Sequence, residues 1–363
     1  MIDGFVEVWF ENRLVGKLAI TGDGLCAFEY DSEFLKNGFS ISPYVLPLEK
    51  KVFIAERDPF DGNFGVFDDS LPDGWGTLLL DRYLKESGKN LESISILERL
   101  CIVGTSGRGA LEYRPDKSLM GSKEFKDFDK IADTCKKILA EKSVDKSSLE
   151  SLYKNGGSSG GARPKIFAKI DGREWLVKFK SSADPENIGE IEYKYSLLAK
   201  KCGIEMPQTR LINGKYFAVE RFDRNKTKIH TISASGLLNA YYRIPSLDYA
   251  DLLMVCDNLT KDRSEVLQMF RRMVFNVLIE NKDDHSKNFS FQHINGEWKL
   301  SPAYDLLPSS GFNNSHTTSI NGKGNPDTDA MVVVAKKSSI TEKLAKEIIS
   351  EISNIIGKNK WTK

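Results

Sequence analysis

The sequence has few cysteines and histidines, and their placement argues against a metal or disulfide framework. Its five cysteines are odd in number, are spread along 363 residues and include no C-x-x-C pair. This pattern disfavours structural zinc and a set of disulfides. Only four histidines are present, so a histidine-rich metal site is disfavoured too.

Long apolar runs and a strong net charge are also missing. No uncharged apolar stretch reaches the roughly 18 residues that a membrane helix needs, and the N-terminus carries acids where a signal peptide needs basic residues. The formal net charge of +1 is too small to bind nucleic acid or an anionic membrane on its own. We therefore expect a cytoplasmic protein without membrane contact.

The overall composition is typical of a globular protein. Patterns along the chain predict its subdomains. Residues 5–10 and 14–20 alternate apolar and polar side chains around a short turn, which predicts a β-hairpin. Residues 78–87 have helical spacing. We expect residues 1–115 to form a mostly-β subdomain with one or two helices.

A polar connector at residues 116–154 follows, with one amphipathic helix predicted from apolar residues at intervals of three and four. These residues are Phe125, Phe128, Ala132, Cys135, Ile138 and Leu139. Residues 155–222 then begin with a Gly-rich loop (residues 155–161). A hairpin around Asp171-Gly172, a helix from Pro185 to Gly203 and a second hairpin around Asn213-Gly214 follow it.

The last part, residues 223–363, is predicted to be mainly helical. Helices are expected at residues 247–253 and 264–280, with a hairpin around Asn295-Gly296. A final helix is expected to start at a capping box formed by Ser339 and Glu342 and to end at Gly357.

Three polar residues after the long helix have the spacing of a phosphotransfer site. Asp283 and Asn288 lie five residues apart in one loop, and Asp305 follows the next hairpin. In such sites the first aspartate accepts a proton from the attacking hydroxyl, and the asparagine and second aspartate hold Mg²⁺. The alternative is a solvated polar loop at a helix end.

Earlier features are each ambiguous alone. The Gly-rich loop is either a flexible linker or a phosphate cradle. Lys178 on a strand and Glu192 on the next helix are either surface charges or the ion pair that holds phosphates in kinases. Residues 220–223 are either an ordinary edge strand or a hinge. Their order along the chain favours an α+β, two-lobed, protein-kinase-like fold with an N-terminal mostly-β subdomain and a helical C-terminal lobe.

The sequence resembles the HipA family of serine/threonine protein kinases, the toxins of bacterial toxin–antitoxin pairs. The resemblance rests on SSGGARPK, WLVKF, AVERFDR, KDDHSKNFSF and LSPAYDLLP, and on VEVWFENRLVGKLAI and FDDSLPDGWG near the start. It covers nearly the whole chain. There is no H-R-D or D-F-G motif, and the region after Asp305 is short, so the helical lobe is expected to be reduced relative to longer members of the family.

The resemblance implies roles for particular residues. Asp283 would be the catalytic base, Asn288 and Asp305 the Mg²⁺ ligands, and Ser158 the autophosphorylated serine, with Ser159 as the alternative. Glu220 and Phe222 would meet adenine through backbone groups, Asp223 the ribose and Lys178 the phosphates. The remaining residues of the implied ATP site are Gly160, Gly161, Glu192, His285 and Lys287.

The resemblance also implies partners. We expect a small helix-turn-helix antitoxin (HipB-like), operator DNA bound only through it, and a protein substrate such as an aminoacyl-tRNA synthetase. Two other functions remain open: a small-molecule or lipid kinase of related fold, and a nucleotide-binding pseudokinase that acts as a co-repressor. Phosphorylation of Ser158 would add about −1.5 to −2 charges beside the nucleotide, and Lys165 or Arg163 could then pair with the phosphate and draw the loop away.

Overall fold

The computed structural model describes residues 4–86, 88, 90–118, 127–157 and 160–359. The chain divides into two compact units. The first comprises Met1–Glu190 and Thr209–Ile232, and the second comprises Ile191–Gln208 and Ser233–Lys363.

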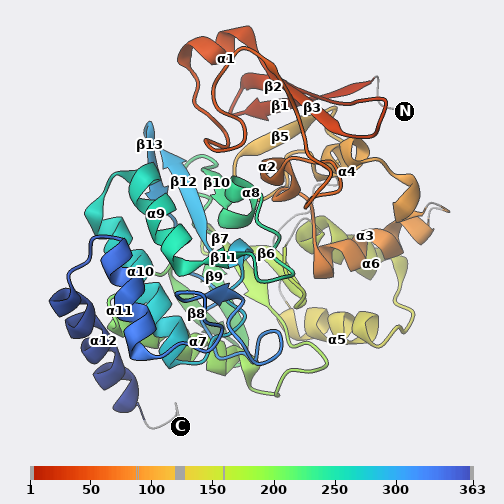
Figure 1. Cartoon of the computed structure of the whole chain (residues 1–363). Helices are drawn as coiled ribbons and strands as arrows, with labels where there is room; N and C mark the ends of the chain where they lie inside the picture. Colours follow the sequence, from red (N-terminus) through yellow and green to blue (C-terminus); the bar gives the residue numbers. More distant parts are fainter. Residues whose placement is uncertain (1–3, 87, 89, 119–126, 158–159, 360–363) are drawn as a thin grey trace. The chain divides into compact units, whose positions relative to one another are not determined.

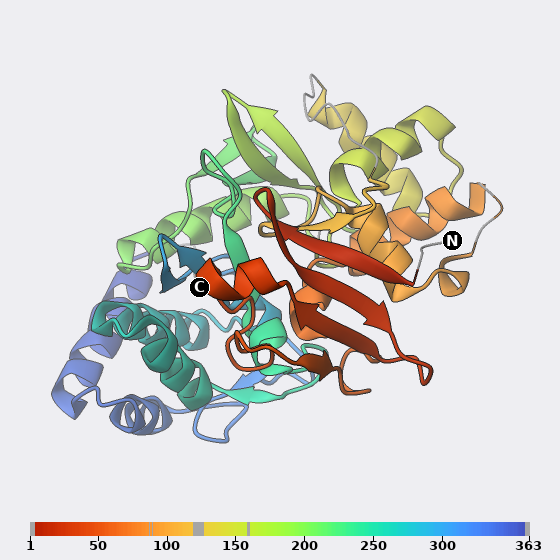
Figure 2. The same cartoon turned by 90° about the horizontal axis from the view of Figure 1, so that it is seen from above.

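The first unit begins with a five-stranded sheet in the order β4-β3-β2-β1-β5, drawn mostly in red in Figure 2. Its strands are β1 (Phe5–Phe10), β2 (Arg13–Ile20), β3 (Cys26–Tyr30), β4 (Val52–Ile54) and β5 (Leu111–Arg114). β1 and β2 pair antiparallel, which confirms the predicted hairpin. Val6, Val8, Val15 and Leu18 are fully buried, so the alternating residues supply the core of this sheet.

This N-terminal module (residues 4–114) is more helical than predicted. Its helices are α1 (Ser32–Asn37), α2 (Gly65–Asp68), α3 (Gly74–Glu86), α4 (Ile96–Val103) and the 3₁₀ helix η1 (Leu91–Ser93). The expectation of one or two helices was wrong because most of them are too short to show a helical period. Local caps define them instead: Asp31 caps α1, and Ser95 and Glu98 form a capping box on α4.

The connector contains two helices rather than the single one predicted. α5 (Phe128–Leu139) confirms the periodic stretch, and Phe125 lies outside the described residues. α6 (Lys146–Gly156) is capped by Asp145 and extends into the expected Gly-rich loop, so Asn155 and Gly156 are helical. Together with α3, both helices contribute to a hydrophobic core that includes Trp75, Trp175 and Val177.

A four-stranded antiparallel sheet in the order β6-β7-β9-β8 completes the first unit. Its strands are β6 (Lys165–Ile170), β7 (Arg173–Lys178), β8 (Thr209–Ile212) and β9 (Tyr216–Glu220). Both predicted hairpins are confirmed. Asp171 and Gly172 have φ of 50° and 78°, the left-handed conformation that a two-residue hairpin turn requires. β10 (His230–Ser233) then leads toward the second unit.

The second unit is mainly helical, as predicted. Its helices are α7 (Ile188–Lys201, most of which belongs here), α8 (Ala234–Leu238), α9 (Tyr249–Thr260), α10 (Arg263–Leu278), α11 (Thr328–Lys337) and α12 (Glu342–Gly357). α9 to α12 lie side by side in Figure 1 and contact one another. β11 (Leu247–Asp248) pairs in parallel with β14 (Thr318–Ser319).

The third predicted hairpin is confirmed as β12 (Ser290–Ile294) and β13 (Glu297–Leu300), but the last helices differ from expectation. α11 was not predicted, and α12 is capped by Thr341, whose hydroxyl accepts the Leu344 N–H. Ser339 has φ of 57°, so the predicted Ser339 capping box was wrong, because a left-handed residue cannot occupy the extended N-cap position. Among the described residues, no helix is long and apolar enough to cross a membrane.

Candidate active site

The loop after α10, residues 281–288, carries two of the predicted site residues. Asp283 is exposed, whereas Asn288 is half-buried at the end of the 3₁₀ helix η2 (Ser286–Asn288). The Asn288 Nδ2 donates to the Asp283 backbone oxygen at 2.8 Å, and the Asn288 N–H donates to the His285 oxygen at 2.8 Å. The side-chain bond ties the Asn288 amide to the backbone of Asp283.

Hydrogen bonds join this loop to the Asp305 loop (residues 301–311). The Asn281 Nδ2 donates to the Asp305 backbone oxygen at 3.1 Å. The Lys282 N–H donates to the Ser309 oxygen at 3.0 Å, and the Ser309 N–H donates to the Glu280 oxygen at 3.1 Å. The second unit therefore brings the loops of Asp283, Asn288 and Asp305 together, although Asp305 follows Asp283 by a whole hairpin.

The donor atoms of Asn288 and Asp305 suit a hard cation. Both offer side-chain oxygens, the ligands that Mg²⁺ takes, and Mg²⁺ commonly binds through one or two protein groups plus substrate phosphates. No cluster of three or more His, Cys, Asp or Glu side chains suited to a metal occurs among the described residues. A site of this kind would therefore need further oxygens from a bound substrate.

Two other predicted residues of this loop flank one aromatic ring. The Lys287 Nζ lies 4.2 Å from the centroid of Tyr242, and the His285 ring lies 5.7 Å from it. The His285 Nδ1 is buried and has no hydrogen-bond partner among the described residues. Tyr242 thus fixes both side chains on the same loop as Asp283.

In the first unit, Lys178 ends β7 and is buried, with its Nζ 5.7 Å from the centroid of Phe217. Lys165 lies directly opposite on β6 and is buried as well. Two buried lysines therefore lie opposite one another at this end of the sheet. Glu192 is buried on α7, in the second unit.

Contacts with the N-terminal module hold the described part of the Gly-rich loop. The Gly161 N–H donates to the Asp73 carboxylate, and the Gly161 oxygen accepts the Trp75 N–H at 3.0 Å. The Gly160 oxygen accepts a bond from the Lys165 Nζ. The Gly161 N–H would have to leave Asp73 before it could bind a phosphate. Ser158 and Ser159 lie outside the described residues.

The predicted hinge (residues 220–223) begins at the end of β9. Glu220 pairs with Trp175 of β7, and its carboxylate lies 3.3 Å from Arg173. The Arg221 N–H donates to the Glu174 oxygen at 2.9 Å. The start of the hinge therefore continues the sheet that carries Lys178. Phe222, the third hinge residue, is half-buried.

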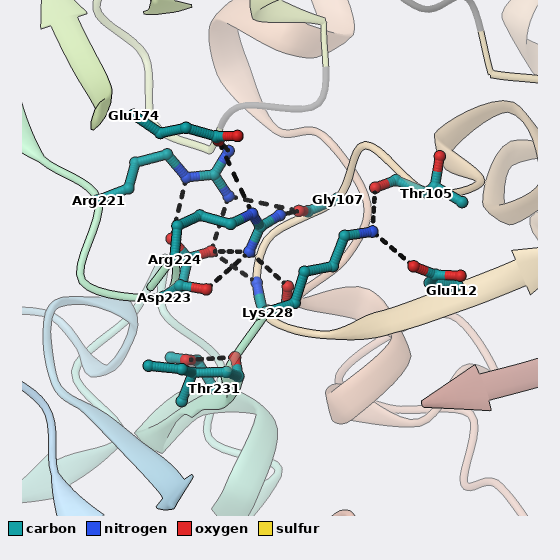
Figure 3. A network of polar contacts seen from close by, with 11 residues as sticks. Thr105, Gly107, Glu112, Glu174, Arg221, Asp223, Arg224, Lys228 and Thr231 are labelled. Carbon is teal, nitrogen blue, oxygen red and sulfur yellow. Dashed lines mark hydrogen bonds and ion pairs between the residues drawn. The ribbon is translucent and has the colours of Figure 1, made fainter. Parts of the chain in front are cut away.

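Asp223 is buried in an ionic network, shown in Figure 3. Its carboxylate accepts bonds from the Arg221 Nε at 2.9 Å and Nη2 at 2.7 Å, and from the Arg224 Nη1 at 2.9 Å. The Gly109 N–H donates to it at 2.9 Å. Both oxygens are thus engaged within the first unit, and binding a ribose hydroxyl would require Asp223 to exchange one of these partners.

The same network reaches the N-terminal module. Arg224 donates to the backbone oxygens of Gly107 at 2.8 Å and Gly109 at 2.7 Å. The Lys228 Nζ contacts the Thr105 oxygen at 2.6 Å and Glu112 at 2.7 Å. Residues 105–112 are therefore tied to the hinge across more than 110 positions of sequence, which no local pattern could have predicted.

The electrostatics of the network follow from burial and pairing. Burial would raise the pKa of the Asp223 carboxyl, but the charges of Arg221 and Arg224 outweigh it, and the pKa lies well below its usual value. Burial lowers the pKa of the Arg224 guanidinium to about 10. The Asp223 carboxylate and the Arg224 guanidinium are therefore both charged at neutral pH.

The chain matches two family profiles. Residues 157–359 match the HipA-like C-terminal domain, and residues 6–114 match the HipA N-terminal domain. The structure is similar to HipA in the Shewanella oneidensis MR-1 complex of HipA, HipB and operator DNA. The TM-score is 0.72 at 18% identity, and the match covers 97% of this chain and 89% of that chain. This likeness confirms the predicted α+β fold class.

Three curated relatives are similar in sequence. "Putative kinase Y4dM" of Sinorhizobium fredii is 28% identical over 221 residues, which cover 53% of this chain and 53% of the relative. "Putative kinase Y4mE" of the same organism is 25% identical over 338 residues, 83% of this chain and 76% of that protein. A "Putative kinase" of Haemophilus influenzae is 27% identical over 145 residues, 34% of this chain and 42% of that protein.

The matched regions thus span about half the length of Y4dM and less than half that of the Haemophilus protein. The C-terminal profile alone covers more than half of the present chain, and the N-terminal profile covers most of the remainder. The chain therefore belongs to the HipA family.

Proposed function

We propose that this protein is an ATP- and Mg²⁺-dependent serine/threonine protein kinase. The observation that carries the proposal is the bond that joins two loops of the second unit. Asn281, in the same loop as Asp283, donates to the backbone oxygen of Asp305 in the other loop. Membership of the HipA family and three relatives with kinase names support it. One acid exposed to substrate, one amide and a second acid on joined loops suit phosphoryl transfer.

In this reaction the Asp283 carboxylate accepts the proton of a serine or threonine hydroxyl. The hydroxyl oxygen forms a bond to the γ-phosphorus, the bond from that phosphorus to the β,γ-bridging oxygen breaks, and ADP leaves. Asn288 and Asp305 would hold Mg²⁺, which when bound neutralises charge on the phosphate oxygens. Asp283 is exposed, as a residue that meets a protein substrate must be.

The remaining predicted residues would bind ATP. Lys178 would contact the phosphates, and Glu192, His285 and Lys287 are the other residues of this group. Gly160 and Gly161 would meet phosphate oxygens after release from Asp73. Glu220 and Phe222 would bind adenine through backbone groups, and Asp223 the ribose.

A radiolabelled-ATP assay on purified protein with cell lysate tests the proposal. We expect label in protein, and a loss of about 10³-fold or more with Asp283→Asn, since a reaction without its base keeps only positioning. Asp257→Asn is the matched control, because Asp257 is an exposed acid on α9 of the same unit. Equal transfer by Asp283→Asn would refute the assignment.

The same assay separates the other two functions. Label in a low-molecular-weight product would indicate a small-molecule kinase. Nucleotide binding without any transfer would indicate a pseudokinase that acts as a co-repressor. The buried Lys178 and the joined loops of the second unit favour transfer over binding alone.

We further propose that the kinase is the toxin of a toxin–antitoxin pair in the cytoplasm. The similar Shewanella structure contains HipB and operator DNA, which supports a HipB-like helix-turn-helix antitoxin as partner, with DNA bound through it. The substrate would be a translation component such as an aminoacyl-tRNA synthetase. Phosphoproteomics after induction of wild type and Asp283→Asn would identify it, and a neighbouring gene without a small DNA-binding product would argue against the pairing.

Autophosphorylation of Ser158, or alternatively Ser159, would regulate the enzyme. Two contacts near the loop bear on the expectation that Lys165 or Arg163 pairs with the phosphoserine. Arg163 already forms a bidentate pair with Asp184 at 3.0–3.1 Å, and Lys165 binds Gly160, so a phosphoserine would have to compete for either. Peptide mass analysis of residues 155–165 with and without Asp283 tests it, and unmodified active protein would exclude it.

A further inference from the structure

Asp284, the neighbour of the proposed base, is fully buried and binds four donors. Its Oδ2 accepts bonds from the Tyr249 hydroxyl at 2.9 Å and the His316 Nδ1 at 2.8 Å. Its Oδ1 accepts the N–H groups of Thr317 at 3.0 Å and Thr318 at 3.2 Å. A carboxylate with this many partners is fixed in position and holds the segment 316–318 against the Asp283 loop.

The hydrogen bonds continue from Asp284 to the other loop. The Asn276 Nδ2 donates to the Tyr249 hydroxyl at 2.9 Å, and the Asn281 Nδ2 donates to the Asn276 Oδ1 at 3.0 Å. The same Asn281 Nδ2 donates to the Asp305 oxygen. An unbroken buried chain of side chains therefore runs from His316 through Asp284 to the backbone of Asp305.

The Tyr249 hydroxyl donates to Asp284 while it accepts from the Asn276 amide. In the tautomer with a hydrogen on Nδ1, His316 donates to the same Asp284 oxygen. Both hydrogens of the Asn281 amide are used. Because a buried network of this kind loses several bonds when one member changes, its geometry is strongly constrained.

We propose that Asp284 is a positioning residue, whose buried carboxylate sets the geometry of Asp283 and Asn288 on one loop and of Asp305 on the other. This inference rests on the proposed kinase function and deepens it. Asp284 would touch neither substrate nor phosphate, since its side chain is fully buried. Mutation of residues that hydrogen-bond to and orient metal ligands commonly lowers metal affinity or activity about 10- to 100-fold.

The test compares Asp284→Asn with wild type. The asparagine Oδ1 can keep the two backbone N–H bonds, but its Nδ2 brings a donor where the Tyr249 hydroxyl already donates. We expect the turnover number to fall about 10- to 100-fold. Mn²⁺ affinity, measured by electron paramagnetic resonance with a non-hydrolysable ATP analogue, should fall by a similar factor.

A control separates positioning from simple loss of stability. Ile352 is fully buried on α12 of the same unit, so Ile352→Ala lowers the melting temperature through a cavity. Its turnover number per folded molecule and its Mn²⁺ affinity should stay within about twofold of wild type. If Asp284→Asn behaves like this control, the inference is overturned.

A second pair of variants decides the question if Asp284→Asn does not fold. His316→Asn can place an amide Nδ2 near the lost Nδ1 and still donate to Asp284, whereas His316→Leu cannot. We expect His316→Asn to retain at least about tenfold more turnover and Mn²⁺ affinity than His316→Leu. Equal values for the two variants would contradict the inference. Wild type that neither transfers phosphate nor binds Mn²⁺ with nucleotide would instead refute the proposed function.

Discussion

In the part of the chain that the structure describes, each unit contains one deeply buried aspartate, and the two are stabilised in different ways. Asp223 in the first unit is 5% exposed and binds two guanidinium groups and one backbone N–H. Asp284 in the second unit is 0% exposed and binds a tyrosine hydroxyl, a histidine and two backbone N–H groups. One network is ionic, and the other depends mainly on hydrogen bonds.

The difference concerns what each network connects. The Asp223 network joins the hinge to residues 105–112 of the N-terminal module, and it does so with charged groups whose separation from water is costly unless they stay paired. The Asp284 network joins neighbouring loops through donors of fixed direction. We infer that the first mainly determines stability and the second mainly determines geometry.

Asp223→Asn should break the first network, and we expect it to lower the free energy of unfolding more than any of the other substitutions. Its two arginine partners then keep only the partly exposed Glu174 carboxylate, at 3.6 and 3.8 Å, as a counter-charge, and breaking a buried ion pair typically costs about 3–5 kcal/mol. Urea unfolding, with hydrogen exchange resolved by peptide, measures the loss. Exchange should rise in peptides of residues 105–112 and 220–231, while peptides of α11 and α12 should change little. A uniform rise throughout the chain would contradict the assignment.

The double variant Asp223→Asn with Arg221→Met should be more stable than Asp223→Asn alone. It removes one charge of each sign. The Met side chain takes the place of Arg221, whose Cζ lies 4.1 Å from the centroid of the Phe167 ring. Coupled neighbours typically show interaction energies of about 0.5–3 kcal/mol, so we expect a recovery of about 1–3 kcal/mol. The same urea series measures it. Additive losses would show that the network is not ionic in the sense proposed.

Tyr249→Phe should weaken the second network by less. It removes one hydroxyl, so that Asn276 loses an acceptor and Asp284 a donor, at a cost of about 1–3 kcal/mol. Met269→Leu is the control, because it changes a buried residue of α10 in the same unit at nearly constant volume. Thermal unfolding compares the two. A loss no greater than that of the control would show that the hydroxyl bonds contribute little.

The sequence was most informative where structure is local. The dipeptides Asp171-Gly172 and Asn295-Gly296 predicted hairpins correctly because their turns need left-handed residues. Ser339 misled because a serine three residues before a glutamate resembles a cap, whereas the actual cap is Thr341. α6 was missed because its buried residues, such as Leu149 and Leu152, are few within a polar segment.

The candidate site was only partly predictable. Spacing suggested Asp283, Asn288 and Asp305, but the bond from Asn281 that joins their loops depends on tertiary structure. Asp284 was overlooked because its burial and its contacts with Tyr249 and His316 arise from distant segments, although the doublet of acids was a visible signal. The bond from the Gly109 N–H to Asp223 likewise depends on folding of the N-terminal module onto the hinge.

The smallest expected effect is on the pH dependence of the unfolding free energy, and it follows from the lowered pKa of Asp223. A carboxyl whose folded pKa is depressed contributes stability above its unfolded pKa of about 3.9, and this contribution is lost as pH falls toward the folded value. While the folded carboxyl stays ionised, the loss from this group is about 0.3 kcal/mol between pH 7 and pH 4 and about 1.3 kcal/mol between pH 7 and pH 3. The double variant Asp223→Asn with Arg221→Met lacks the carboxyl, so urea unfolding at each pH should show a shallower acid decline by these amounts. Parallel declines in the two proteins would mean that Asp223 is not held ionised by its arginines, and the contrast between the two networks would then fail.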